Sequence, residues 1–299
     1  MTKILITGGT GFIGSALTKR LLVQHYEVTV LSRHPEATEK LGLDGVDILS
    51  SLSELTPEDS FNVVINLAGA PIFDVRWTEV RKQLIRKSRI NLTEQLVACM
   101  ARMTIKPELL ISGSAIGYYG DQGDCVLTEQ SEVKQNFSQQ LCTDWEEAAK
   151  EAEQLDVRVC IIRTGLVLGD GGLLNRMLLP FRFGLGGRLG NGKQWMSWIH
   201  LQDWLSIAEK MISDNSMSGA YNATAPNPVT NAEFTRVLAK TVNRPALFPL
   251  PARLLTVLLG EMSSLVLGSQ RVLPERLQAQ GFSFKYVDLA SALVQIIKH

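Results

Sequence analysis

Short apolar runs alternate with segments of helical periodicity over the first part of the chain. Lys3–Thr7 is a run of mainly apolar residues that predicts a buried parallel strand, and Glu27–Leu31 has similar chemistry. Between them, Ser15–Tyr26 carries apolar residues at helical spacing and is predicted to form a helix. The order strand, glycine-rich turn, helix and strand predicts a right-handed βαβ unit.

The alternation continues to about residue 169. Three further strands are predicted, at Asn62–Leu67, Glu108–Ser114 and Val157–Arg163. Two long helices are predicted between them, at Thr78–Met103 and Phe137–Leu155. Strands that alternate with helices over this length predict an α/β fold of the Rossmann type, with a doubly wound parallel sheet.

The second part of the chain has a different organisation, because frequent glycines interrupt the βαβ rhythm after Gly169. A short strand is predicted at Trp195–His200. Helical segments are predicted at Gln202–Ser213, Asn231–Val242, Ala252–Leu259 and Pro274–Gln280. With one return to the sheet near His200–Asn222, this predicts a Rossmann domain of residues 1–169 plus about 200–224. A smaller, mostly helical C-terminal domain would comprise about 170–199 and 225–299.

Composition narrows the class of protein. Of 299 residues, 45% are hydrophobic and 20% charged, which is typical of a globular protein. Thirty basic residues balance thirty acidic ones, so the composition gives no indication of nucleic-acid or membrane binding. The four cysteines have neither disulfide nor zinc-site spacing and favour a reducing cytoplasm, and no metal site is expected. No apolar run approaches the roughly 20 residues of a membrane span, and the N-terminal apolar run is too short for a signal peptide. The pattern leaves the oligomeric state open.

A glycine-rich motif follows the first predicted strand. Gly8 permits a tight turn, Gly11 allows the backbone to approach a pyrophosphate, and Gly14 lets the helix pack against the strand. The helix that starts there offers unpaired N–H groups and the positive end of its dipole to phosphates. In this position the motif predicts a dinucleotide cofactor rather than a purely structural turn.

The end of the second predicted strand distinguishes NAD from NADP. An acidic residue there would favour the ribose hydroxyl of NAD. This chain instead has Ser32 and Arg33, which can hydrogen-bond and pair with a 2′-phosphate. The alternative is that Arg33 is a solvated surface residue. Its position at the strand end favours NADP(H).

Four motifs together resemble the extended short-chain dehydrogenase/reductases of the sugar-nucleotide epimerase group. They are Gly8–Gly14 (GGTGFIG), Asn66–Gly69 (NLAG), Ser112–Gly120 (SGSAIGYYG) and Ile162–Gly169 (IRTGLVLG). Four further segments resemble the atypical, NADP-binding epimerase family proteins, which carry a C-terminal domain of unknown function. These segments are Asp144–Glu147 (DWEE), Leu178–Arg182 (LLPFR), Trp198–Asp203 (WIHLQD) and Leu273–Phe282 (LPERLQAQGF).

The resemblance implies roles for individual residues. The turn Gly8–Gly14, including Thr10, Phe12 and Ile13, would bind the cofactor, and Leu67, Ala68 and Gly69 would line its adenosine side. Arg89 and Asn91 would face the cofactor from the long helix. Asn91 would match the helix asparagine of the family, and Ser114 its active-site serine. From the residues alone, Asn91 could equally be an exposed polar residue, and Ser114 a turn former at a strand end.

The catalytic pair of the family, Tyr-x-x-x-Lys, is absent. None of the five tyrosines has a lysine four residues later, and the helix expected to carry the pair reads SQQLCTDWEE over 138–147. Other residues could supply a proton: Tyr118 assisted by Ser114, with Tyr119 as the rival, or His200 or Cys142. Each of these residues could instead have a structural role. The two tyrosine rings could pack the loop against the sheet, His200 could be a hydrogen-bonded structural histidine, and Cys142 could be a small buried thiol. Trp195 and Trp198 could stack on a substrate or pack in a core, and Glu146 and Glu147 are expected on a solvated helix face.

Two classes of function follow. The first is an NADP-dependent oxidoreductase or nucleotide-sugar epimerase with a rearranged proton donor and a small-molecule substrate of unknown identity. The second is a non-catalytic NADP(H)-binding protein that senses redox state or regulates a partner. The two differ in whether NADPH is consumed or only bound.

Overall fold

A seven-stranded parallel sheet forms the centre of the protein. The computed structural model describes residues 2–34, 38, 41–43 and 45–298. The sheet has the order β11-β7-β5-β4-β1-β2-β3, and every neighbouring pair is parallel. Its strands are β1 (Lys3–Thr7), β2 (Glu27–Leu31), β3 (Asp47–Leu49), β4 (Val63–Asn66), β5 (Leu109–Ala115), β7 (Arg158–Thr164) and β11 (Gly219–Ala223). The order reverses between β1 and β4, the place where doubly wound sheets form their ligand crevice.

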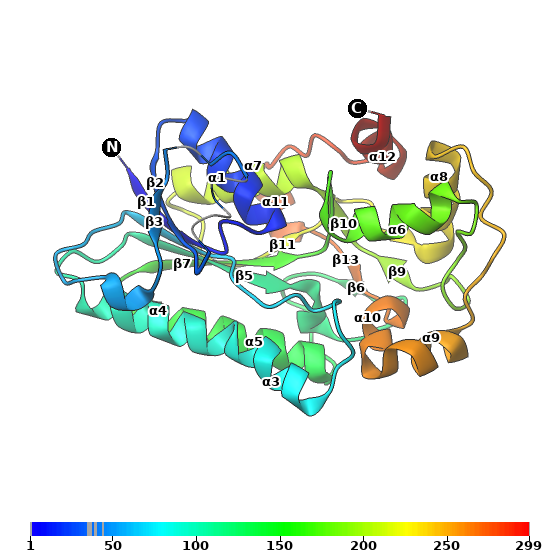
Figure 1. The fold of residues 1–299 in the computed structure, drawn as a ribbon, viewed down its shortest axis with the longest axis horizontal. Coiled ribbons are helices and arrows are strands. Elements are labelled where there is room, and N and C mark those ends of the chain that lie inside the picture. The colour runs from blue at the N-terminus through cyan, green and yellow to red at the C-terminus, as the bar shows by residue number, and fades with distance from the viewer. Residues whose placement is uncertain (1, 35–37, 39–40, 44, 299) are drawn as a thin grey trace.

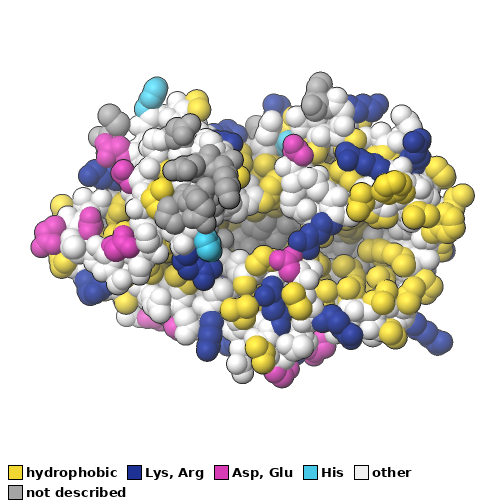
Figure 2. Space-filling model, in the orientation of Figure 1, with side chains coloured by type: hydrophobic (Ala, Val, Ile, Leu, Met, Phe, Trp, Pro, Cys, Tyr) yellow, Lys and Arg dark blue, Asp and Glu magenta, His cyan; other side chains and the backbone are white. Residues whose placement is uncertain are grey.

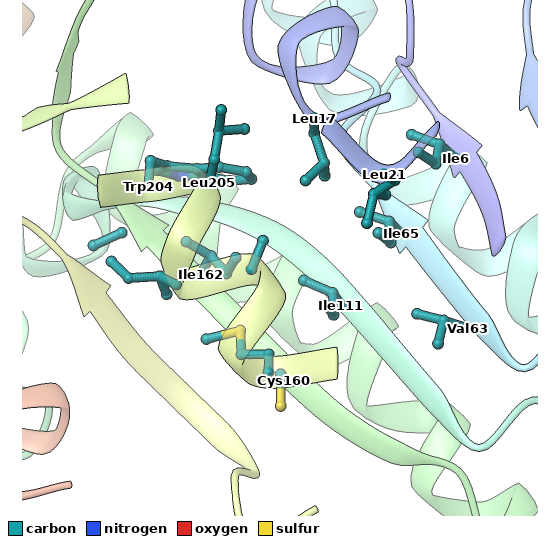
Figure 3. Packing of buried hydrophobic residues seen from close by; sticks show 14 of the residues in the cluster. Ile6, Leu17, Leu21, Val63, Ile65, Ile111, Cys160, Ile162, Trp204 and Leu205 are labelled. Carbon is teal, nitrogen blue, oxygen red and sulfur yellow. The ribbon is translucent and has the colours of Figure 1, made fainter. Parts of the chain in front are cut away.

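Helices cover both faces of this sheet (Figure 1). One face carries α1 (Phe12–Val23), α7 (Leu201–Ser213) and α11 (Glu275–Ala279). The other carries α3 (Glu79–Lys87), α4 (Ile90–Arg102) and α5 (Phe137–Lys150). Side chains alternate across the strands, so that Ile4 and Ile6 belong to one buried cluster and Leu5 to the other. Figure 3 shows Leu17 and Leu21 of α1 and Trp204 of α7 over the strands of the first cluster. The predicted doubly wound α/β fold is confirmed.

A third buried cluster lies beside the sheet. It joins α6 (Gly172–Arg182), α8 (Asn231–Thr241) and α12 (Leu289–Lys298) to the short strands β8 (Leu166–Leu168) and β10 (Trp198–His200). The remaining short elements lie in the connections between these strands and helices. They are β6 (Val126–Leu127), β9 (Trp195–Met196), β12 (Val229–Thr230), β13 (Arg271–Val272), α9 (Ala252–Leu259), α10 (Ser264–Leu267) and the 3₁₀ turns η1 (Leu52–Glu54), η2 (Ile116–Tyr119), η3 (Glu151–Leu155) and η4 (Gly260–Ser263).

The single helix predicted over Thr78–Met103 is wrong, because α3 ends at Lys87 and α4 begins at Ile90. The Ser88 hydroxyl donates to the Ile85 carbonyl and accepts a hydrogen bond from the Ala70 N–H. These bonds fasten the loop after β4 to the break, and a serine that bonds the backbone in this way competes with helical hydrogen bonding. The strand predicted at Trp195–His200 is likewise divided at Ser197 into β9 and β10.

Candidate functional site

The glycine-rich turn joins β1 to α1 and lies directly against the end of β4. Gly8 has φ +71°, and a Cβ there would come within 2.7 Å of the Leu67 backbone. A Cβ on Gly14 would lie 2.1 Å from the Gly8 carbonyl oxygen, which accepts a hydrogen bond from the Gly11 N–H. The backbones of the turn, of α1 and of the Leu67–Ala68 segment therefore meet at distances that only glycine permits. The first turn of α1 begins here, with Gly11 as its N-cap.

The other residues of the turn have separate positions. Thr10 and Ile13 are partly buried, and Ile13 packs against the cluster beneath α1. The Phe12 ring packs against the glycine segment that follows β8, since a Cβ on Gly171 or Gly172 would come within 3 Å of it. This contact links the turn to the chain that leads into α6.

Ser32 and Arg33 follow directly after β2, the strand that pairs with β1. Ser32 is buried, and its hydroxyl donates to the His34 carbonyl at 3.0 Å. Arg33 is exposed. Its guanidinium is therefore accessible to an anion in solution, while the hydrogen bonds of Ser32 fix the local backbone.

Arg89 is the N-cap of α4, in the break between α3 and α4, and its side chain reaches the segment after β4. A Cβ on Gly69 would lie 2.8 Å from its guanidinium carbon, and Arg89 Nη1 donates to the Ala70 carbonyl at 3.1 Å. Burial lowers the pKa of Arg89, and the nearby charge of Arg81 adds to this effect. Asn91 is exposed on α4, whereas Thr93 of the same helix is buried and hydrogen-bonded to Asn66 at 2.7 Å.

The carboxyl ends of β5 and β7 hold a buried ion pair. Glu146 on α5 receives two hydrogen bonds of 2.8 Å from the guanidinium of Arg163 on β7 and one of 2.7 Å from the Ser114 hydroxyl. The side chains of Arg163 and Glu146 are 5% and 1% exposed. Although burial lowers the pKa of Arg163, its hydrogen bonds to Glu146 raise that pKa above its ordinary value. The expectation that Glu146 lies on a solvated helix face is therefore wrong, while Glu147 is exposed.

The two neighbouring tyrosines, Tyr118 and Tyr119, contact this network in different ways. The Tyr119 hydroxyl is fully buried, donates to Asn222 Oδ1 at 2.6 Å and accepts from Arg163 at 3.1 Å. Burial raises the pKa of Tyr119 to about 12. Tyr118 is only partly buried, and the Arg163 guanidinium lies 3.4 Å from its ring centroid. Tyr119 is thus a structural member of the network, and Tyr118 is the more accessible phenol.

No tyrosine lies on α5, and its single lysine, Lys150, is exposed at the helix end. Ser138 and Cys142 instead face Gly117 of η2 from this helix. Burial raises the pKa of Cys142 to about 11. The thiol is therefore neutral near pH 7, which favours its interpretation as a small buried side chain.

His200 and the two tryptophans have structural partners. His200 caps α7 by accepting from the Gln202 N–H, and its ring stacks on Tyr286 with centroids 3.8 Å apart. Trp198 is fully buried in the third cluster. Trp195 is partly buried, and Arg271 lies 4.3 Å from its ring centroid.

We expect His200 to make stability depend on pH. Burial lowers the pKa of His200 below its ordinary 6.5, so the unfolded chain takes up a proton near that pH while the native ring stays neutral. The free energy of unfolding should fall as the pH decreases through 6.5 and level off below the native pKa, with a slope of at most about 1.4 kcal/mol per pH unit. Burial also raises the pKa of Asp203 from 3.8, and its charge interacts with His200, so the two groups titrate as neighbours. Urea unfolding of the parent and of His200→Asn across this range would isolate the histidine, and identical pH profiles would contradict this expectation.

A cavity of about 440 Å³ opens between the start of α5 and the C-terminal helices. Trp77 and Phe137 line it and form an edge-to-face pair with centroids 4.9 Å apart. The carboxylates of Asp121 and Glu261 and the hydroxyl of Ser263 add polar groups. Sequence reasoning did not find this cavity, because its walls come from segments far apart along the chain.

Within the described residues, no group of three or more His, Cys, Asp or Glu side chains could hold a metal ion. No helix in the described part of the chain is long and apolar enough to cross a membrane.

A parallel sheet with a glycine-rich first turn and a strand order that reverses between β1 and β4 defines a dinucleotide-binding α/β protein. The chain matches the model of the NAD dependent epimerase/dehydratase family over residues 4–223. Residues 250–296 match a domain of unknown function, DUF1731. The chain therefore belongs to the NAD-dependent epimerase/dehydratase family, and the resemblance drawn from its motifs is confirmed.

Individual relatives extend the similarity to the whole chain. It is 39% identical over 299 residues to the epimerase family protein YfhF of Bacillus subtilis, covering 99% of this chain and 98% of the relative. The crystal structure of the human epimerase family protein SDR39U1 (isoform 2) with NADPH has a TM-score of 0.90 and 32% identity, with both chains fully covered. A nucleoside-diphosphate sugar epimerase from Corynebacterium glutamicum has a TM-score of 0.78 and 34% identity, covering 99% of this chain and 58% of that one.

Proposed function

We propose that this protein binds NADP(H) and transfers a hydride between the cofactor and a small carbonyl or carbinol substrate. The observation that carries the proposal is the glycine turn packed against Leu67–Ala68, with the exposed Arg33 at the end of the next strand. The NADPH in the crystal structure of human SDR39U1 supports this choice of cofactor. The four cysteines are free thiols, which supports a reducing cytoplasmic location.

The residues present fit the cofactor. The start of α1 would bind the pyrophosphate through backbone N–H groups, with Gly11 leaving room for its approach. Ser32 and Arg33 would bind the 2′-phosphate, and Leu67, Ala68 and Gly69 would line the adenosine side with Arg89 behind them. When bound, the cofactor supplies or accepts the hydride. The remaining requirement is a group that moves a proton at the substrate oxygen.

Arg33→Ala should weaken NADPH binding about tenfold or more and leave NADH binding nearly unchanged. The reason is that the guanidinium contacts only the 2′-phosphate that NADH lacks. Titration calorimetry of both cofactors with the parent and the variant measures this difference. Lys19→Ala, which removes an exposed cation from the outer face of α1, is the matched control. Equal affinity of the parent for NADH and NADPH would refute the assignment.

We infer that Tyr118 donates the proton, assisted by Ser114 and Asn91. Tyr118 follows Ser114 by four residues at the carboxyl edge of the sheet and is the more accessible of the two adjacent phenols. The guanidinium of Arg163 lies against its ring and holds the ring in position at this edge. In the absence of the usual lysine, we expect slow turnover that rises toward alkaline pH in the oxidising direction.

Tyr118→Phe should reduce turnover at least tenfold once a substrate is found by following NADPH oxidation over sugar nucleotides and small carbonyls. The loss should appear in kcat with little change in NADPH affinity, because only the hydroxyl is removed. Tyr26→Phe, remote from the crevice, is the control. A Tyr118→Phe rate within about threefold of the parent, or roughly 0.7 kcal/mol, would exclude the residue from the reaction.

The cavity beside the C-terminal helices favours a sugar-like substrate. We infer that about 170–199 and 225–299 form a smaller domain over the reactive end of the cofactor, with residues 1–169 and about 200–224 as the Rossmann domain. Aromatic rings, hydroxyls and carboxylates line the cavity, and the cation at its wall, Lys82, is paired with the Glu261 carboxylate. Such a lining suits a hydroxyl-rich ring better than a diphosphate. The nucleotide part of a nucleotide sugar would then lie outside the cavity.

A non-catalytic redox sensor is the second candidate. The observation that favours it is that α5 presents Ser138 and Cys142, and no tyrosine, toward η2. A sensor would bind NADPH and NADP⁺ with different affinities and consume neither. Isotope exchange at the nicotinamide with a range of carbonyl compounds would exclude the sensor, and binding without exchange would support it.

A further inference from the structure

One end of the molecule exposes a concentrated apolar surface, the right-hand end in Figure 2. Its large side chains come from the end of α6, the segment 247–250 and the outer face of α9. We call this surface the apolar end patch. Its members are Leu179, Phe183, Leu185, Leu247, Phe248, Leu250, Leu254, Val257 and Leu258. Phe183, Leu247 and Val257 are 74%, 72% and 71% exposed. Contiguous exposed apolar surface of this kind marks an interaction site.

Backbone hydrogen bonds hold the patch in place. The Phe248 N–H donates to the Gly186 carbonyl at 3.2 Å, and the Leu250 N–H donates to the Arg188 carbonyl at 2.9 Å. A Cβ on Gly187 would lie 2.0 Å from the Phe248 carbonyl oxygen, so the two segments are in direct contact. The patch is therefore a built surface of two joined segments rather than a single loose loop.

The two faces of α9 have different environments. Leu254, Val257 and Leu258 are exposed at positions i, i+3 and i+4, whereas Leu255 is buried. Thr256 and Gly260, which follows the helix, line the cavity. The helix thus connects the cavity wall to the outward apolar stripe.

The two segments that form the patch carry charge of one sign. Residues 177–190 and 243–259 contain Arg182, Arg188, Arg244 and Arg253, with no aspartate or glutamate. All four arginines are exposed, and none forms a salt bridge with a carboxylate of the described residues. The net charge of zero for the whole chain conceals this local excess. The balanced composition gave no indication of membrane binding, because it reports only the sum of the charges and not where the arginines lie.

We propose that the apolar end patch docks on an anionic phospholipid surface. Phenylalanine and leucine side chains would enter the headgroup boundary, while the arginines bind lipid phosphates with their apolar stems against the patch. A bilayer accepts apolar side chains without requiring a complementary shape. A second copy of the chain is a poorer occupant, because a symmetric interface would gather arginines from both copies without a carboxylate from either segment. The attachment is peripheral and independent of the proposed reaction.

The test uses the full chain in vesicle flotation, with vesicles of phosphatidylcholine alone or with about 30% phosphatidylglycerol. We expect binding to the anionic vesicles at about 0.1 M salt, and weaker binding at about 0.5 M because the arginines are screened. Arg182→Gln/Arg253→Gln should reduce partitioning about 30-fold, since each basic residue near such a surface contributes about fivefold.

Variants of the apolar side chains measure the contribution of their insertion into the bilayer separately from the contribution of the arginine charges. Phe183→Ser/Phe248→Ser/Val257→Ser should reduce partitioning at least tenfold with an unchanged melting temperature, because all three side chains are already exposed in the native state. The matched control, Val23→Ser/Val80→Ser/Ile105→Ser, removes equally exposed apolar residues elsewhere and should bind as the parent does.

Three results would overturn the proposal. The first is no binding to anionic vesicles, and the second is equal binding of the parent and both patch variants. The third is a concentration-dependent dimer, measured by sedimentation, that the patch variants dissociate while vesicle binding is absent. That last result would assign the patch to a second copy of the chain.

Discussion

Glu146→Ala is expected to lower the free energy of unfolding by about 3–5 kcal/mol. The carboxylate receives two hydrogen bonds from Arg163 and one from Ser114 at a position that is 1% exposed. Removing it leaves a guanidinium charge in the interior with a deficit of acceptors, and desolvation of that charge is the largest part of the cost. Chemical denaturation at neutral pH measures the change. The folded variant should also lose the fixed orientation of Ser114.

A double-mutant cycle tests the origin of this cost. Arg163→Met removes the buried charge, so Glu146→Ala/Arg163→Met should be less destabilised than the sum of the two single variants. Glu147→Ala, at the exposed neighbouring position, should change stability by no more than about 0.5 kcal/mol. A Glu146→Ala variant as stable as Glu147→Ala would show that the ion pair is not buried in solution.

The fold was predictable from sequence because its signals are local. β1 and β2 are encoded by short, mainly apolar runs and α1 by a segment of 3.6-residue periodicity, with the glycines that the turn requires between β1 and α1. The break between α3 and α4 was not predictable in this way. Ser88 interrupts the helix by binding the Ala70 N–H, which comes from the loop after β4.

The candidate site also combines features that the local sequence encodes with features that depend on distant segments. Gly8 and Gly14 carry their role in the local sequence, because the turn demands them wherever the strand and helix meet. The local sequence does not reveal that Glu146 is buried, because its partner Arg163 is on a different element. The adjacent residue of the same helix, Glu147, is exposed. The cavity depends on four separate segments and could be found only in three dimensions.

Gly14→Ala is expected to weaken NADPH binding at least about 100-fold and to destabilise the fold by about 1–3 kcal/mol. The added methyl group would lie 2.1 Å from the Gly8 carbonyl oxygen and 2.9 Å from the Gly9 Cα. Both neighbours are backbone, so the overlap is relieved only if α1 moves away from the turn. That movement displaces the N–H groups that would bind the pyrophosphate. Titration calorimetry and denaturation of the same sample measure the two effects together.

Gly11→Ala is the informative comparison for this prediction. A Cβ at Gly11 has no neighbour nearer than the Gly8 carbonyl oxygen at 3.2 Å, and the position is exposed. The substitution should therefore destabilise the fold less than Gly14→Ala does, while it still weakens NADPH binding by obstructing the approach of the pyrophosphate to the backbone. Loss of binding in both variants, with the larger loss of stability in Gly14→Ala, separates ligand approach from helix packing. Unchanged NADPH affinity in both would exclude the glycine turn as the cofactor site.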